Sequence, residues 1–241
     1  MTRAPAIRVE GSARLPDGVL FSALELDIAP ARWTCLLGPS GVGKSTILRL
    51  LAGLGTEAVF DGAVVASDGS DIAPRVAYMA QEDLLLPWAS VRDNVSLGAR
   101  LRGGRVDRAR LHELLDRVGL GAMADRRPGA LSGGQRQRVA LARTLMEDKP
   151  VVLLDEPFSA LDARTRSDMQ DLACRLLENR TVLLVTHDPA EAARLAHKIV
   201  VLSESGQIAL DPPPGHAPRA VDDPDTLNAQ GRLLALLRKA A

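Results

Sequence analysis

Residues 38–46 form a segment whose residue types and spacing suit phosphate binding. The segment reads Gly-Pro-Ser-Gly-Val-Gly-Lys-Ser-Thr and matches the pattern G-x-x-x-x-G-K-[ST]. Its glycines let backbone N–H groups surround phosphate oxygens, Lys44 can reach the β- and γ-phosphates, and Ser45 can offer a hydroxyl to Mg²⁺. A chance Gly-rich turn is the alternative. The candidate nucleotide-binding residues are Gly38, Pro39, Ser40, Gly41, Val42, Gly43, Lys44, Ser45 and Thr46.

A second segment ends an apolar run with two adjacent carboxylates. Residues 151–154 are Val-Val-Leu-Leu, and Asp155, Glu156 and Pro157 follow directly. Two carboxylates at the end of a buried strand are costly unless they meet a cation or water. We expect Asp155 to hold Mg²⁺ and Glu156 to orient and deprotonate an attacking water, as in other phosphate-loop proteins. An acidic turn after a core strand is the alternative.

A third segment, residues 131–138, combines a serine with two glycines at the start of a helical pattern. It reads Leu-Ser-Gly-Gly-Gln-Arg-Gln-Arg, so that Ser132, Gly133, Gly134 and Gln135 form a second candidate anion site. A helix that is simply capped by Ser132 is the alternative. The segment lies about 90 residues after the phosphate loop.

The elements that must position these segments alternate between apolar runs and helical patterns. Such nearly continuous apolar runs suit strands of a parallel sheet that is covered on both faces. The fold class is therefore predicted as α/β: a P-loop NTPase core with a mainly parallel sheet, a small antiparallel β subdomain and an inserted helical subdomain. Strands are expected over 33–37, 75–79, 151–155, 181–186 and 198–202, and helices over 44–54, 91–101, 108–118, 134–146, 163–178 and 189–196.

One domain is expected to occupy the whole chain, residues 1–241. Its α/β core with the antiparallel subdomain takes residues 1–82 and 150–210, and residues 83–149 form the helical subdomain because no convincing strand occurs there. Residues 211–241 begin with a Pro-rich stretch and end in an amphipathic pattern over 227–239. This tail is predicted to be a peripheral or loosely packed helix.

Composition excludes several classes of protein. The 241 residues carry 30 Lys and Arg and 30 Asp and Glu, and only 2% are aromatic. Zero net charge and scarce aromatics argue against a nucleic-acid partner. The longest uncharged stretch has 11 residues, at 33–43, which is too short to span a membrane. With no apolar leader after Met1 and two distant cysteines, a reduced, cytosolic compartment is expected.

Taken together, the motifs resemble those of ABC transporter ATP-binding subunits. The resemblance covers about residues 6–210, and its most specific part is the Leu-Ser-Gly-Gly-Gln segment some 20 residues before Asp155. The residues that carry it, in order, are Gly38–Thr46, Gln81, Leu131–Gln135, Val151–Glu156, Ser159–Asp162 and His187.

The resemblance implies a mechanism and roles for individual residues. Two subunits pair head to tail around two ATP molecules, and the phosphate loop of one faces Ser132, Gly133 and Gly134 of the other. Gln81 then touches Mg²⁺ and the attacking water, and His187 contacts the γ-phosphate. The implied catalytic residues are Glu156, His187 and Gln81, and the implied metal ligands are Ser45, Gln81 and Asp155.

One position departs from the family pattern. The family usually has an aromatic residue about 23 positions before the phosphate loop, stacked on adenine, and here that position is Leu15. Phe21, the nearest aromatic alternative, falls in the following strand and is expected in the core. This departure implies loose base selectivity, and Leu15→Tyr is predicted to tighten ATP binding.

The resemblance also implies partners. ATP-binding subunits of this length serve bacterial or archaeal importers as peripheral proteins on the cytoplasmic side of the inner membrane, with separate permease subunits and a solute-binding protein. The permease is expected near Leu84–Trp88, unless Trp88 only belongs to the core of the helical subdomain. The Leu-Leu-Pro-Trp wording resembles importers of nitrate, sulfonates, taurine or thiamine precursors. An exporter or lipid-extraction ATPase, or a soluble non-transport ABC ATPase, is the alternative.

Overall fold

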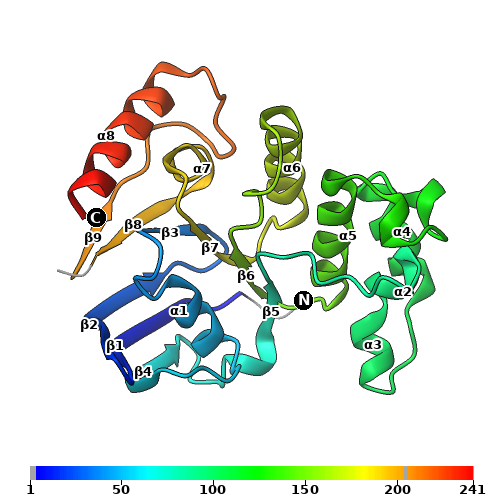
Figure 1. The fold of residues 1–241 in the computed structure, drawn as a ribbon, viewed down its shortest axis with the longest axis horizontal. Helices are drawn as coiled ribbons and strands as arrows, with labels where there is room; N and C mark the ends of the chain where they lie inside the picture. Colours follow the sequence, from blue (N-terminus) through cyan, green and yellow to red (C-terminus); the bar gives the residue numbers. More distant parts are fainter. Residues whose placement is uncertain (1–3, 204–205, 241) are drawn as a thin grey trace. The chain divides into compact units, whose positions relative to one another are not determined.

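The computed structural model describes residues 4–203 and 206–240, which divide into two compact units (Figure 1). The first unit comprises Met1–Tyr78, Pro150–Glu156 and Leu177–Ala241, and the second comprises Met79–Lys149 and Pro157–Leu176. The second unit thus contains the range expected for the helical subdomain, 83–149, and adds residues 79–82 and 157–176, which were expected in the α/β core.

A six-stranded sheet is the centre of the first unit, in the order β5-β6-β7-β3-β8-β9. β3 pairs in parallel with β7 and β8, β6 pairs in parallel with β7, and β9 pairs antiparallel with β8. Every residue of β3, β6 and β7 is buried, which explains their continuous apolar sequences. The strands span Trp33–Leu37 (β3), Val76–Met79 (β5), Val151–Asp155 (β6), Thr181–Thr186 (β7), Lys198–Ser203 (β8) and Gly206–Leu210 (β9). The parallel strands agree with the prediction, and β9 is an addition to it.

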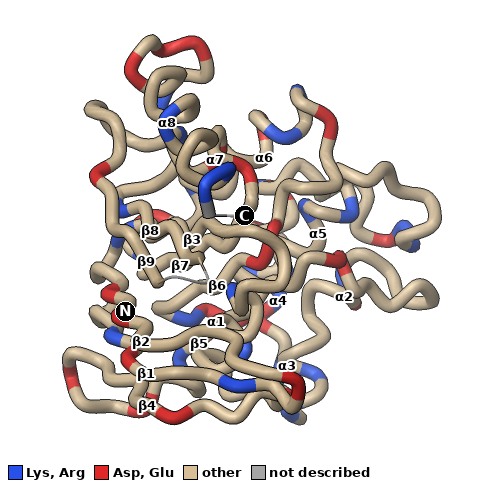
Figure 2. The backbone as a smooth tube through the Cα atoms, turned by 60° about the vertical axis from the view of Figure 1, so that its left-hand side comes forward, with Lys and Arg blue, Asp and Glu red and all other residues tan. Residues whose placement is uncertain are grey.

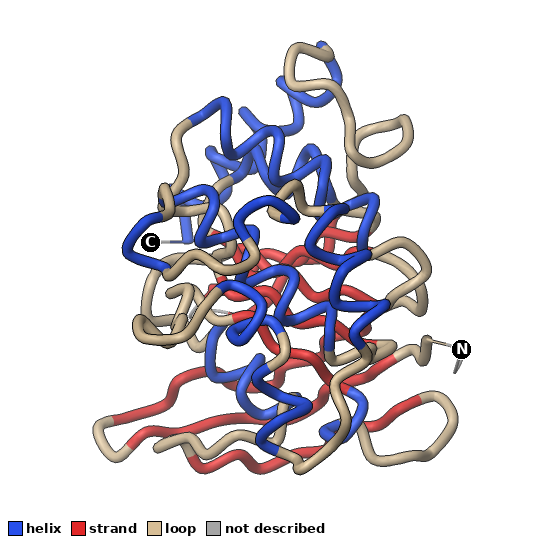
Figure 3. The backbone as a smooth tube through the Cα atoms, turned by 90° about the vertical axis from the view of Figure 1, so that its right-hand side faces the viewer, coloured by secondary structure: helices blue, strands red, loops and turns tan. Residues whose placement is uncertain are grey.

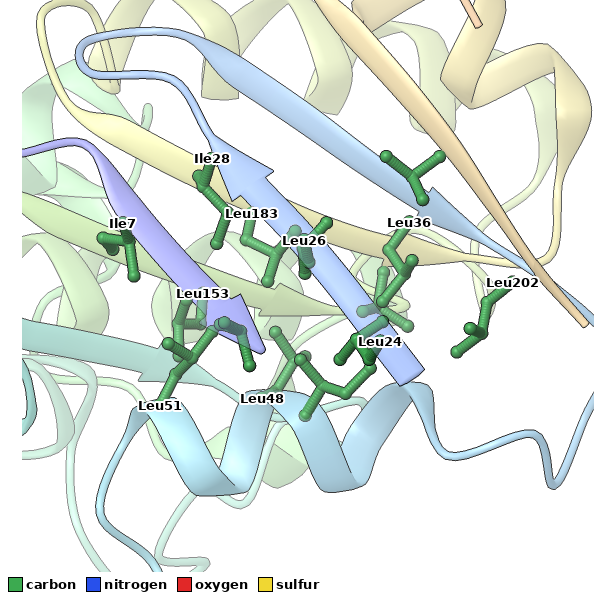
Figure 4. Packing of buried hydrophobic residues seen from close by; sticks show 14 of the residues in the cluster. Ile7, Leu24, Leu26, Ile28, Leu36, Leu48, Leu51, Leu153, Leu183 and Leu202 are labelled. Carbon is green, nitrogen blue, oxygen red and sulfur yellow. The ribbon is translucent and has the colours of Figure 1, made fainter. Parts of the chain in front are cut away.

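A three-stranded antiparallel sheet, β2-β1-β4, covers one side of the core of this unit. Its strands are β1 (Ile7–Leu15), β2 (Gly18–Ile28) and β4 (Val59–Ala66). Buried side chains of β1 and β2 meet those of the central sheet and of helix α1 (Lys44–Leu51), as Figure 4 shows. Each fully buried leucine or isoleucine contributes about 1.5–3 kcal/mol of transfer free energy. The labelled members are Ile7, Leu24, Leu26, Ile28, Leu36, Leu48, Leu51, Leu153, Leu183 and Leu202.

The C-terminal tail is docked on the first unit. Helix α8 (Pro224–Ala240) packs against helix α7 (Pro189–Leu195) and buries Ala229 and Leu233. Arg219, buried just before α8, donates to the carbonyl oxygens of Ala193 and Ala196 at 3.0 Å each. Since those carbonyls end α7, the guanidinium caps that helix and fixes the start of the tail. The peripheral helix was predicted correctly, but it is packed rather than loose.

The second unit consists of helices and loops, apart from Met79 at the end of β5 (Figure 3). Its helices are α2 (Val91–Val95), α3 (Leu97–Leu101), α4 (Arg108–Arg117), α5 (Gly133–Met146) and α6 (Ala163–Leu176). The expectation of a single helix over 91–101 is wrong, because the helix is interrupted at Ser96. The Ser96 hydroxyl donates to the carbonyl oxygen of Arg92 at 2.8 Å, a local bond of the kind that bends helices.

None of the helices among the described residues has the length and apolar character needed to span a bilayer.

Candidate active site

The phosphate loop connects β3 to α1, and its glycines are required by its backbone. Gly41 and Gly43 have φ values of 87° and 100°, in the left-handed region that glycine adopts without strain. A Cβ atom on Gly38 would lie 2.5 Å from the carbonyl oxygen of Leu202 in β8. Larger residues at these positions would distort the loop, so its N–H groups could not converge on a phosphate.

Lys44 opens α1 and folds back over the loop. Its Nζ donates to the carbonyl oxygens of Gly38 and Pro39 at 2.8 and 2.7 Å. Burial lowers the pKa of the Lys44 ammonium, and the nearby Glu156 and Asp155 carboxylates oppose that shift. The side chain is therefore held in place by the loop and can exchange a carbonyl partner for a phosphate oxygen.

Asp155 ends β6 and lies beside the start of α1. The Ser45 hydroxyl donates to its Oδ1 at 3.0 Å, and the hydroxyl of Tyr78, on β5, donates to its Oδ2 at 2.9 Å. Burial raises the pKa of the Asp155 carboxyl, while these two hydrogen bonds lower it. A buried carboxylate next to a serine hydroxyl is an oxygen donor set that suits Mg²⁺.

Glu156 and His187 meet at the ends of neighbouring parallel strands. Glu156 Oε2 lies 2.9 Å from Nδ1 of His187, the residue that follows β7. The backbone N–H of Glu156 donates to the carbonyl oxygen of Val185 at 2.9 Å, with φ at 44°. A non-glycine residue in this region costs about 1–3 kcal/mol and occurs most often at functional sites. The backbone is therefore strained at the residue expected to be the base.

Ser132 begins helix α5 in the second unit. Its hydroxyl accepts a hydrogen bond from the N–H of Gln135 at 3.2 Å, and its own N–H donates to the Gln135 side chain at 2.9 Å. This reciprocal cap satisfies the Gln135 N–H, whereas helix geometry gives the N–H groups of Gly133 and Gly134 no partner within α5. A Cβ atom on Gly134 would lie 2.5 Å from the Thr165 side chain, so the glycine also allows α6 to approach.

The predicted site residues divide between the two units. The first unit brings together Lys44, Ser45, Asp155, Glu156 and His187. The second unit holds Gln81 and the segment from Ser132 to Gln135. Tyr78 lies in the first unit and was missed. Its only signal in the sequence is that it is the single tyrosine, on the strand expected over 75–79.

The turn between β1 and β2 lacks an exposed aromatic side chain. Leu15 is 38% exposed there, while Phe21 is buried in the core cluster as expected. A Cβ atom on Gly43 would lie 2.8 Å from Phe21 and 2.9 Å from Leu20, so β2 reaches the phosphate loop. The exposed position expected to hold the stacking aromatic is therefore occupied by an aliphatic side chain, Leu15.

The comparison with family models decides the family. A model described as ABC transporter matches residues 21–159, more than half of the chain. The chain belongs to the ABC transporter ATP-binding family. A member of this family binds ATP and hydrolyses it to drive transport, so the chain is an ABC-type transport ATPase.

Known ABC proteins resemble this one over most of its length. An uncharacterized ABC transporter ATP-binding protein of Haemophilus influenzae is 47% identical over 224 residues, which are 89% of this chain and 91% of that protein. The aliphatic sulfonates import ATP-binding protein SsuB of Delftia acidovorans is 44% identical over 242 aligned positions, gaps included, which cover 97% of this chain and 95% of that protein. SsuB of Yersinia pestis is 49% identical over 202 residues, 82% of this chain and 72% of that protein.

A solved structure supports the fold of this ABC ATPase. It is a bacterial Atm1-family ABC exporter with ATP bound, which matches with a TM-score of 0.75 at 24% identity. The match covers 100% of this chain and 43% of the exporter chain, so this chain spans less than half of that protein. At this identity the likeness concerns the fold alone.

Proposed function

We propose that this chain is the ATP-hydrolysing subunit of an importer and that binding and hydrolysis of MgATP drive solute uptake through separate membrane subunits. The observation that carries the proposal is the grouping of Ser45, Asp155, Glu156 and His187 beside the phosphate loop. Asp155 ends β6, Glu156 follows it and His187 follows β7, so the parallel pairing of these strands brings the side chains together.

The first unit would bind the phosphates and the cation. The backbone N–H groups of residues 38–46 and the ammonium of Lys44 suit the β- and γ-phosphates. Ser45 and Asp155 would hold Mg²⁺, joined by Gln81 as the resemblance implies. When bound there, Mg²⁺ would supply positive charge that neutralises the phosphates and the leaving oxygen.

Hydrolysis would use the Glu156–His187 pair. Glu156 accepts a proton from the attacking water as the water oxygen bonds to the γ-phosphorus and the bond to the bridging oxygen of ADP breaks. His187, 2.9 Å from Glu156 Oε2, is placed to orient that carboxylate and to donate a hydrogen bond to the γ-phosphate. Gln81 would position the same water.

The second unit would complete a partner's site. Ser132, Gly133, Gly134 and Gln135 form a capped helix start, and we assign the N–H groups of Gly133 and Gly134 and the Ser132 hydroxyl to the γ-phosphate held by a second copy of the chain. Ser132 and Gly133 are exposed, which suits a group that meets its ligand only on pairing. The head-to-tail dimer also explains two anion sites in one chain.

A permease would dock on the exposed segment Leu84–Trp88. Leu84 is 58% exposed and Trp88 is 69% exposed, so Trp88 is not a core residue of its unit. The segment is nevertheless fixed: the buried Asn94 side chain bonds Leu86 and Ala89, and Arg143 donates to the carbonyl oxygen of Leu84 at 2.8 Å. A rigid exposed apolar surface is typical of an interaction site.

The transported solute that the relatives favour is an aliphatic sulfonate, since several are named as aliphatic sulfonate import proteins. Among the solutes suggested by the Leu-Leu-Pro-Trp segment, this choice agrees with the sulfonates, which include taurine, rather than with nitrate or a thiamine precursor. The subunit would be held on the cytoplasmic face of the cell membrane by its permease. A solute-binding protein on the outer side would deliver the solute.

The test combines uptake with capture of the complex. Deleting the gene should abolish growth with ethanesulfonate as sole sulfur source and spare growth on sulfate, and the wild-type gene should restore it. Tagged Glu156→Gln protein, purified from membranes with ATP, should retain a multi-span permease, and the exposed-site variant Glu178→Gln is the matched control. Growth that is unaffected by the deletion would reject the sulfonate, and export of the solute would reject import.

A further inference from the structure

Both oxygens of the Asp155 carboxylate are held by hydroxyl groups from different elements. Oδ1 accepts the bond from Ser45, at the start of α1, at 3.0 Å. Oδ2 accepts the bond from Tyr78, on the neighbouring strand β5, at 2.9 Å. A carboxylate bonded through one oxygen can still rotate about its Cβ–Cγ bond, whereas two bonds in different directions fix the plane of the group.

Tyr78 is itself held in position. Its ring is half-buried and packs, together with Val76 of the same strand, against the core cluster of the first unit. Because side chains alternate along a strand, Ala77 and Met79 point to the opposite face. The hydroxyl is therefore delivered to Asp155 by a ring that the core holds in place.

We propose that Tyr78 is a positioning residue that sets the orientation of the Asp155 carboxylate, so that Oδ1 faces Ser45 and the cation of the bound nucleotide. This inference rests on the proposed function, which assigns Ser45 and Asp155 to Mg²⁺. Tyr78 keeps one oxygen of Asp155 occupied and leaves the other for the ion. Groups that bond a metal ligand from behind commonly change metal affinity 10–100-fold when they are removed.

Tyr78→Phe tests the proposal because it removes the hydroxyl and keeps the ring. With a fluorescent non-hydrolysable ATP analogue bound, the Mg²⁺ concentration at half-saturation should rise about tenfold. Binding of the analogue without Mg²⁺ should be unchanged, and a thermal unfolding curve establishes that the variant is folded. A merely structural role would not separate these two binding measurements.

The chain's single tyrosine supplies a second readout in the wild-type protein. After incorporation of 3-fluorotyrosine, the one ¹⁹F resonance should shift when Mg²⁺ is added to the protein with the analogue bound. The shift should disappear in Asp155→Asn. This measurement does not depend on the folding of Tyr78→Phe.

The outcomes separate this inference from the proposed function. If Asp155→Asn weakens Mg²⁺ binding and Tyr78→Phe does not, or if the ¹⁹F resonance does not respond to Mg²⁺, the role of Tyr78 is overturned and the proposed function stands. If Asp155→Asn leaves Mg²⁺ binding unchanged, the metal assignment in the proposed function fails, and the inference fails with it.

Discussion

In the first unit, the residues assigned to the nucleotide bond one another across different elements, whereas in the second unit Ser132 and Gln135 bond each other within one helix start. Ser45, at the start of α1, bonds Asp155 at the end of β6, and Glu156 bonds His187 just after the ends of β6 and β7. Ser132 is tied to Gln135, three residues later in α5. The candidate site of the first unit is therefore held in place by bonds between its own residues, and we call it the prepared site. The second unit instead presents the capped start of α5 at its surface.

The two units also differ in charge, although Figure 2 shows both signs interspersed along the chain. The residues of the second unit include 16 Lys and Arg against 12 Asp and Glu, and those of the first include 14 against 18. Zero net charge thus hides opposite charges of the two units. Opposite charges would favour the head-to-tail pairing proposed above.

Glu156→Gln is expected to have the largest effect, because it removes the base from the prepared site. Turnover should fall by about 10³-fold, within the range for loss of a general base, while ATP binding is retained. Phosphate release and equilibrium dialysis measure the two quantities, and Glu178→Gln controls for the loss of one carboxylate. Wild-type turnover in Glu156→Gln would place the base elsewhere.

Ser132→Arg tests the second unit alone. The long cation at the helix start should block pairing and lower turnover about 100-fold, comparable to the loss of one anion-stabilising donor. Binding of ATP to the variant's own phosphate loop should stay within about twofold, because no element of the first unit changes. Ultracentrifugation with ATP measures pairing, and Ser132→Ala separates loss of the cap from blockage. ATP-driven dimers of Ser132→Arg would contradict the in-trans role.

Much of the difference between the two units could be predicted from the sequence. Residues of the phosphate loop and of β6 are specified by motifs and by continuous apolar runs, because their backbone geometry and two-sided burial restrict residue types. The contacts that join segments distant in sequence could not be predicted. Tyr78 on its strand is equally consistent with a core position, and nothing local links it to Asp155, 77 residues away.

Two other differences have local physical reasons. The helical pattern alone does not predict the interruption at Ser96, because the interruption depends on the hydrogen bond from the Ser96 hydroxyl to the carbonyl oxygen of Arg92. The addition of residues 157–176 to the second unit depends on packing of α6 against α5, which sequence order does not indicate.

Asn94→Ala should destabilise the second unit without touching the first. The buried side chain accepts from the N–H of Leu86 at 2.8 Å and donates to carbonyl oxygens of Leu86, Ala89 and Ser90. Leaving such groups unsatisfied should lower the free energy of unfolding by about 2–3 kcal/mol. Urea unfolding measures this, with the exposed Asn228→Ala as the matched control. Equal urea midpoints for both variants would show that other contacts hold the Leu84–Trp88 segment in place.

Leu15→Tyr should sharpen the prepared site of the first unit. An aromatic ring in the exposed turn beside the phosphate loop can stack on adenine, which is worth about 1 kcal/mol, or about fivefold in ATP affinity. The control Val65→Tyr places the same ring at another exposed position of the same antiparallel sheet. If both variants bind ATP as the wild type does, the base does not lie against Leu15.

His197→Asn should have the smallest effect. The substitution should change only how the stability of the first unit depends on pH. His197 Nδ1 accepts from the backbone N–H of Trp33 at 3.2 Å, and burial, followed by the charges of Arg32 and Arg219, lowers its pKa below 6.5. As pH falls through 6.5, the unfolded chain takes up a proton that the folded chain resists, so this residue makes stability decline. Asparagine keeps an acceptor but does not titrate, and urea unfolding between about pH 7.5 and 5.5 should therefore show a shallower decline in the variant than in the wild type. The exposed His112→Asn serves as control, and an unchanged decline in His197→Asn would mean that the pH dependence of stability arises from other groups.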